Sequence, residues 1–158
     1  MTDISEIKNQ LKTINIIHLS LMAGMLLFFA VVLVVIQSNE MNINKDLDKI
    51  FTIIVPVYGL IAMFMARLIF NLIISKYTSG TDLQDKIFKY RSAKIVSWAI
   101  LESGCILSII ATMLTSNYLY IAVLIFLLGY FYMLRPSRQS LINDLQLNSQ
   151  EKDLILGK

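Results

Sequence analysis

The stretch SAKIVSWAILESGCILSIIATML (residues 92–114) decides the fold class. It is long and apolar enough to form a membrane-spanning helix, because a span needs about 20 mainly apolar residues. The same stretch carries a carboxylate, Glu102, inside its apolar run. An ionisable group within a membrane span is costly and usually faces a partner or a cavity. We therefore expect Glu102 to have a partner, and the nature of that partner bears directly on function.

The composition of the 158-residue chain is typical of a membrane protein. Hydrophobic residues make up 56% of it and charged residues 16%, whereas soluble domains contain about 25% charged residues. The chain has one cysteine, Cys105, and one histidine, His18. These counts exclude an intrachain disulfide and a metal site built from several Cys and His ligands. We expect neither a metal nor another cofactor.

Four apolar segments predict an all-α fold, a polytopic membrane protein with a four-transmembrane-helix bundle. The spans cover about residues 14–36, 50–74, 95–115 and 118–134. Only Ser116 and Asn117 separate the third span from the fourth, so these two must form an antiparallel hairpin.

Short amphipathic helices are expected at both ends of the chain, over residues 3–13 and within 137–158. Asp3 with Glu6, and Asn148 with Glu151, resemble capping boxes at the starts of such helices. We divide the chain into a membrane domain, residues 1–136, and a tail, residues 137–158.

The basic residues predict the orientation in the membrane. On one side of the spans, only Lys45 and Lys49 occur. On the other side lie eleven: Lys8, Lys12, Lys76, Lys86, Lys89, Arg91, Lys94, Arg135, Arg138, Lys152 and Lys158. By the positive-inside rule, both termini and the loop between spans two and three are cytoplasmic, in a cell inner membrane.

Residue spacing gives Glu102 a candidate partner, Arg67. Glu102 lies eight residues after Lys94, so ~12 Å from the cytoplasmic edge if Lys94 marks that edge. Arg67 lies nine residues before Lys76, so ~13 Å from the same edge. An unpaired Arg at the centre of a span costs roughly 2.5–3.5 kcal/mol. The sequence therefore predicts a buried Arg67–Glu102 ion pair on neighbouring helices.

Three further polar residues are expected near this pair. His18 lies ~9 Å deep on the same side, Asn71 lies one turn from Arg67, and Tyr130 lies near the cytoplasmic end of span four. The outer half of the bundle offers almost no polar groups, so we expect one polar cluster that opens inward. The pair could hold helices together, form a ligand, ion or proton site with His18, or contact another subunit.

His18 itself has two interpretations. We expect a hydrogen-bonded interior group, and the alternative is a titrating switch, because the ordinary pKa of histidine is about 6.5.

Small and aromatic residues predict how the spans pack. Small residues four positions apart let helices approach closely, and one such face could meet a second copy. The pairs are Ser20 with Gly24, Ala62 with Ala66, and Gly104 with Ser108. Tyrosines at both ends of span four suggest an aromatic belt at the membrane surfaces. They are Tyr118, Tyr120, Tyr130 and Tyr132.

Two resemblances to known families arise from these residues. The segments LQDKI (residues 83–87) and AILE (residues 99–102) resemble the ion-binding helix of rotor subunit c of F- and V-type ATP synthases. That resemblance implies that Glu102 binds a proton or a sodium ion. The chain departs from the family in lacking its Arg-Gln-Pro loop motif and a glycine-rich preceding helix.

The second resemblance covers nearly the whole chain. The order of YRSAKIVSWAILESG (residues 90–104), the TSN turn (115–117), LRP (134–136) and INDLQLNS (142–149) is similar to a family of small four-span bacterial membrane proteins without an assigned activity. It implies the same architecture and a bacterial inner membrane, and it adds no chemistry.

The motifs of known enzymes do not occur in this sequence. It contains no Gly-rich phosphate loop, HExxH, nucleophile elbow or paired catalytic carboxylates, so we predict no catalytic residues and no enzyme. The first interpretation is a non-enzymatic inner-membrane accessory or scaffold subunit, and the alternative is a small transporter or a ligand- or proton-binding protein that uses Glu102. The partners we expect are the lipid bilayer and another membrane protein or a second copy. The basic run over residues 86–94 suits anionic headgroups and not nucleic acid.

Overall fold

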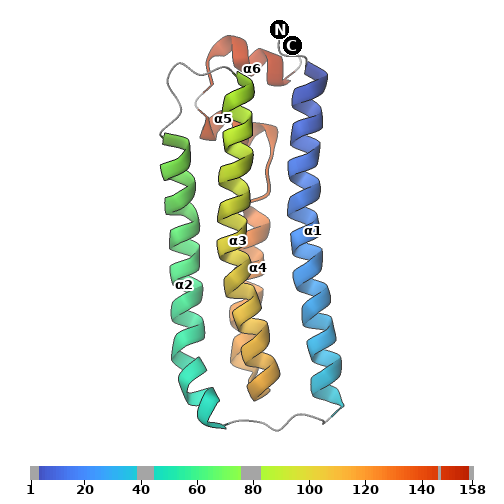
Figure 1. Cartoon of the computed structure of the whole chain (residues 1–158), viewed down its shortest axis with the longest axis vertical. Coiled ribbons are helices and arrows are strands. Elements are labelled where there is room, and N and C mark those ends of the chain that lie inside the picture. The colour runs from blue at the N-terminus through green and yellow to red at the C-terminus, as the bar shows by residue number, and fades with distance from the viewer. Residues whose placement is uncertain (1–3, 39–44, 76–82, 146, 157–158) are drawn as a thin grey trace.

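The computed structural model describes residues 4–38, 45–75, 83–145 and 147–156, which form six α-helices. Four long helices lie side by side along the long axis, and two short ones lie at the end where the first begins (Figure 1). In chain order they are α1 (Ile4–Gln37), α2 (Lys45–Ser75), α3 (Leu83–Thr115), α4 (Tyr118–Met133), α5 (Arg138–Asp144) and α6 (Ser149–Leu156).

Three of these helices are long and apolar enough to cross a membrane. They are α2, α3 and residues 9–37 of α1. The fourth, α4, has 16 residues, a length of ~24 Å, which falls short of the ~30 Å hydrocarbon core. It passes the same test only together with α5, from which it is bent by 82°. The all-α fold is confirmed, with three candidate spans, or four if this bent pair is counted as one.

The predicted hairpin between the third and fourth apolar segments is confirmed. Ser116 has a positive φ of 54°, which turns the chain after α3 ends. The Asn117 side chain then accepts a hydrogen bond from the Leu119 N–H at 2.9 Å and so caps α4. The buried face of α4 consists of Tyr120, Leu124, Leu127 and Phe131.

Small residues set the contact between α2 and α3. Ala62 and Ala66 are buried on α2, and Gly104 and Ser108 are buried on α3. A Cβ at Gly104 would lie 3.2 Å from a methyl group of Leu127 on α4 and 3.6 Å from the Cβ of Ala62. Two of the three predicted small-residue pairs therefore lie at this contact.

The third predicted pair, Ser20 with Gly24, does not mediate a helix contact. Both residues are exposed, and a Cβ at Gly24 would have no atom within 4 Å. The aromatic belt is also only partly as expected. Tyr118 and Tyr132 are exposed, Tyr130 is half-buried, and Tyr120 is fully buried, because its hydroxyl belongs to an internal hydrogen-bond network described below.

The tail forms the two expected short helices, and their apolar side chains pack against the bundle. Leu141, Leu145 and Ile155 are buried. The predicted capping box is present in α6. The backbone N–H of Asn148 donates to Glu151 Oε2 at 3.0 Å, and the backbone N–H of Glu151 donates to Asn148 Oδ1 at 2.8 Å. The other predicted capping box, Asp3 with Glu6, involves residues whose side chains are not among those that the structure describes.

Candidate functional site

The predicted ion pair between Arg67 and Glu102 is not formed. Arg67 is exposed, Glu102 is half-buried, and neither has an ion-pair or hydrogen-bond partner among the residues that the structure describes. The register of α2 and α3 explains why. The Ser97 hydroxyl donates to the Ala66 carbonyl at 2.9 Å, so Glu102, five residues further along α3, is level with Ile61. Arg67 is therefore offset from Glu102 by roughly 9 Å along the axis.

The expectation was wrong because it placed Lys94 at the membrane edge. Lys94 is instead buried within the bundle, with 7% of its surface exposed. Its ammonium lies 4.3 Å from the centre of the Phe70 ring and 5.1 Å from that of Tyr90, distances typical of cation–π contacts. Because Lys94 is covered by other side chains of the bundle, its position does not mark a membrane edge on α3.

The carboxylate that pairs with Lys94 comes from the tail. Asp144, the last residue of α5, lies 3.2 Å from the Lys94 ammonium. Removing one member of a buried pair leaves the other charge uncompensated, so the pair ties α5 to the bundle. Sequence reasoning missed this contact because the two residues are 50 positions apart. One signal was present, since Tyr90, Lys94 and Trp98 are spaced by four and share one face of α3.

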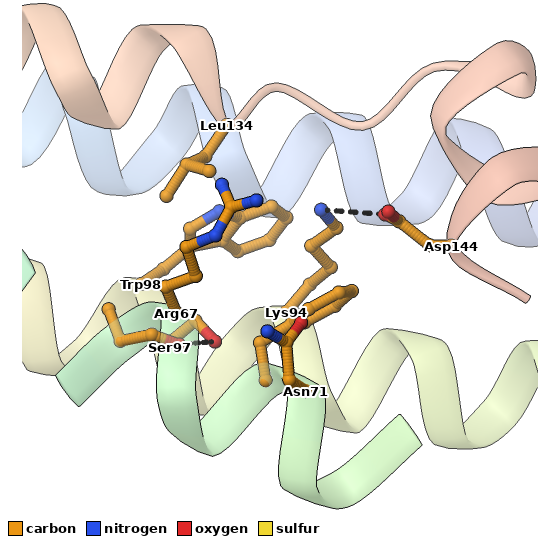
Figure 2. Close-up of a pocket in the computed structure, with 9 residues that line it drawn as sticks. Arg67, Asn71, Lys94, Ser97, Trp98, Leu134 and Asp144 are labelled. Carbon is orange, nitrogen blue, oxygen red and sulfur yellow. Dashed lines mark hydrogen bonds and ion pairs between the residues drawn. The ribbon is translucent and has the colours of Figure 1, made fainter. Parts of the chain in front are cut away.

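A cavity of about 100 Å³ lies beside this pair (Figure 2). Its lining comes from α2, α3 and the end of α4 as well as from α5: Ala66, Arg67, Phe70, Asn71, Lys94, Ser97, Trp98, Leu134 and Asp144. In Figure 2 the side chains of Arg67 and Lys94 extend toward the segment that carries Leu134 and Asp144. Two cationic side chains, Arg67 and Lys94, and one anionic side chain, Asp144, therefore line the cavity where the tail meets the bundle.

The structure brings together some of the predicted site residues and separates others. Arg67 and Asn71 line the cavity, and His18 contacts it indirectly through Trp98. Glu102 is not among the lining residues, and Tyr130 lies along a different depression on α4. The predicted cluster of five is thus divided among separate places in the bundle.

His18 is the hydrogen-bonded interior group that the sequence favours. It is fully buried, and its Nε2 donates to the Phe131 carbonyl at 3.0 Å. Its ring stacks on Phe131 with centroids 4.7 Å apart and lies 4.8 Å from the Trp98 ring. Because a carbonyl only accepts, Nε2 carries the proton. Within the described part of the chain, the other ring nitrogen, Nδ1, is buried without a hydrogen-bond partner, as is the indole N–H of Trp98.

A second polar network closes the opposite end of the bundle. The Tyr120 hydroxyl donates to Asp48 Oδ1 at 2.6 Å, and the Asn117 amide donates to the same oxygen at 2.9 Å. The Thr52 hydroxyl lies 3.3 Å from that of Tyr120. Asp48 of α2, which precedes the predicted second span (50–74), therefore fastens the α3–α4 hairpin at this end.

The two tail helices are also held at the N-terminal part of α3. The Tyr90 hydroxyl lies 2.9 Å from that of Ser140, and the Lys86 ammonium lies 2.7 Å from Glu151 Oε1. Burial disfavours the charged form of Glu151, but the hydrogen bonds from Lys86 and from the Asn148 N–H outweigh it and lower its pKa. The tail is thus fixed to the helix that also carries Glu102.

Among the described residues, no three His, Cys, Asp or Glu side chains are grouped so that they could hold a metal ion. Comparisons of the chain with protein-family models, with curated proteins and with solved structures found no match. Its function is therefore inferred from its own geometry.

Proposed function

We propose that the chain is a non-enzymatic four-span inner-membrane protein that acts as an accessory or scaffold subunit. It associates within the membrane, through the face of α3 that carries Glu102, with another membrane protein or with a second copy. Both termini are cytoplasmic in this proposal, and the tail helices lie on that side.

The distribution of charge supports the proposed orientation. The end of the bundle where α1 begins and where α5 and α6 lie (Figure 1) carries most of the described basic residues, among them Lys12, Lys86, Lys89, Arg91, Arg135, Arg138 and Lys152. The other end carries Lys45 and Lys49. This bias is the one that places basic residues in the cytoplasm.

The observation that carries the proposal is the environment of Glu102. Its carboxylate lies in the middle of the candidate span α3, half-buried, with no partner in the described part of the chain. Val96 and Ala99, close by on α3, are exposed. An ionisable group at this depth costs about 2.5–3.5 kcal/mol against lipid, and a donor from a neighbouring protein removes most of that cost.

The alternative function, transport or ligand and proton binding at Glu102, has less support. Such a role requires a cavity at the carboxylate, and the cavity beside Lys94 does not include Glu102 in its lining.

Site-specific photo-cross-linking in native membranes tests the proposal. A photoreactive residue at Ala99, one turn before Glu102, is expected to give a discrete protein adduct. The adduct should persist in Glu102→Gln, which can still hydrogen-bond, and be lost in Glu102→Leu. Phe64 on α2, which is 67% exposed, is the control position and should yield lipid adducts only. Lipid adducts alone at Ala99 in the parent protein would contradict the proposal.

A further inference from the structure

The cavity beside Lys94 has the features of a binding site for a small anion. Arg67 lies at its exposed rim with no partner in the described chain, and its five N–H donors suit oxyanions. Trp98 lines the same cavity and is fully buried, and its indole N–H has no hydrogen-bond partner among the residues that the structure describes. A buried donor without a partner loses about 1–3 kcal/mol, which an acceptor placed in the cavity would restore.

The charges around the cavity select the charge of the ligand. Arg67 and Lys94 each bring one positive charge, and Asp144 brings one negative charge to the rim beside Lys94. The net charge is therefore +1. A monoanion neutralises it, whereas a dianion would leave an excess negative charge beside the Asp144 carboxylate.

The size and position of the cavity further limit which ligands it can bind. A volume of about 100 Å³ is well below the roughly 300–1,000 Å³ of sites for drug-sized molecules. It suits one compact headgroup and not a bulky substrate. The cavity also lies where the tail meets the bundle, since Leu134 follows α4 and Asp144 ends α5. In the proposed orientation this is the cytoplasmic surface of the membrane, where anionic lipid headgroups occur.

We propose that this cavity binds a singly charged phosphate group through Arg67, Lys94 and the indole N–H of Trp98, as the phosphodiester of an anionic lipid or as free phosphate. The carboxylate of Asp144 stays on Lys94 and sets the preference for one negative charge. This site is distinct from the Glu102 face and does not depend on the proposed association there.

Tryptophan fluorescence gives a readout confined to this site, because Trp98 is the only tryptophan of the chain. The full chain in neutral detergent is titrated with phosphatidylglycerol in one arm and with inorganic phosphate in the other. Native mass spectrometry counts the bound lipids. Arg67→Gln removes a charge from an exposed position, so it should leave the fold intact. Arg91→Gln makes the same change on α3 outside the cavity lining and serves as the matched control.

The parent protein and Arg91→Gln are expected to bind one phosphatidylglycerol with a saturable change in fluorescence, and Arg67→Gln should bind about tenfold more weakly or worse. Trp98→Phe keeps an aromatic side chain and removes the N–H, so native mass spectrometry should show about three- to tenfold weaker binding. Saturation by inorganic phosphate, lost in Arg67→Gln, would identify free phosphate as the source. Equal binding by the parent, Arg67→Gln and Arg91→Gln in both arms, or no binding in either, would overturn the proposal.

Discussion

The two ends of the bundle differ from its middle in whether a charged side chain has a partner within the described chain. At the cytoplasmic end of the proposed topology, Lys94 has Asp144, and at the opposite end Asp48 accepts from Tyr120 and Asn117. In the middle, Glu102 has no partner in the described chain. The ends thus use charge to fasten segments that are distant in sequence, whereas the middle presents a charge outward.

This difference suggests that the paired charges at the ends stabilise the fold, whereas Glu102 in the middle serves association with a neighbour. A group paired within the chain stabilises the fold, and its loss should be measurable in the isolated protein. A group without an internal partner contributes no such stability and depends on a neighbour in the membrane. Substitutions at the ends and in the middle should therefore affect different measurements.

The largest loss of stability is expected from Lys94→Met. It leaves Asp144 without its cation and removes the ammonium from the Phe70 ring, at a cost of about 3 kcal/mol. SDS-induced unfolding of the purified protein measures this. Lys94→Met with Asp144→Leu should recover part of the loss, and Lys152→Met, at an exposed position, should change little. If Lys94→Met is as stable as the parent, the pair does not fasten α5.

A smaller loss, about 1–2 kcal/mol, is expected from Tyr120→Phe. The change removes only the hydroxyl that donates to Asp48 at 2.6 Å. Tyr118→Phe is the matched control, because Tyr118 is 82% exposed on the same helix and should show no effect. Equal stabilities of the two variants would contradict the network at this end.

The Lys86–Glu151 contact should give a pH-dependent contribution of about 1 kcal/mol. The folded pKa of Glu151 lies below its ordinary value of 4.5. Its contribution is therefore complete above pH 4.5 and is lost as the pH falls through the lowered folded pKa. Unfolding at pH 7 and pH 3 should show that Glu151→Gln is less stable than the parent at pH 7, and that the difference is smaller at pH 3. A constant difference between the two proteins would argue against the charged contact.

The smallest effect on the isolated chain is expected from Glu102→Leu. The unfolding free energy should stay within about 0.5 kcal/mol of the parent or rise, because no internal partner is lost. A loss comparable to that of Lys94→Met would mean that Glu102 is paired within the chain after all, which would remove the difference between the middle and the ends.

Much of the architecture could be predicted from the sequence because apolar run length, two-residue turns and capping residues are local signals. The α3–α4 hairpin at Ser116–Asn117 and the start of α6 at Asn148 follow from such patterns. The end of α4 at Met133 lies one residue before the predicted end of the fourth span at residue 134.

The contacts between helices could not be predicted in the same way. The register of α2 against α3 depends on how closely Gly104 and Ala62 allow the two backbones to approach, and hydropathy contains no such information. In the observed register Glu102 is level with Ile61, and Arg67 lies six residues further along α2. The pair between Lys94 and Asp144 depends on the path of the tail, which follows from tertiary packing of Leu141 and Leu145 and not from a local pattern.

The central claim, that Glu102 serves association and not folding, is tested most directly by the particle mass in native membrane nanodiscs. The parent protein should be found in a particle heavier than one chain plus its lipid, and Glu102→Leu should shift that mass to the single chain while remaining folded. The same single-chain mass for both proteins would contradict the account.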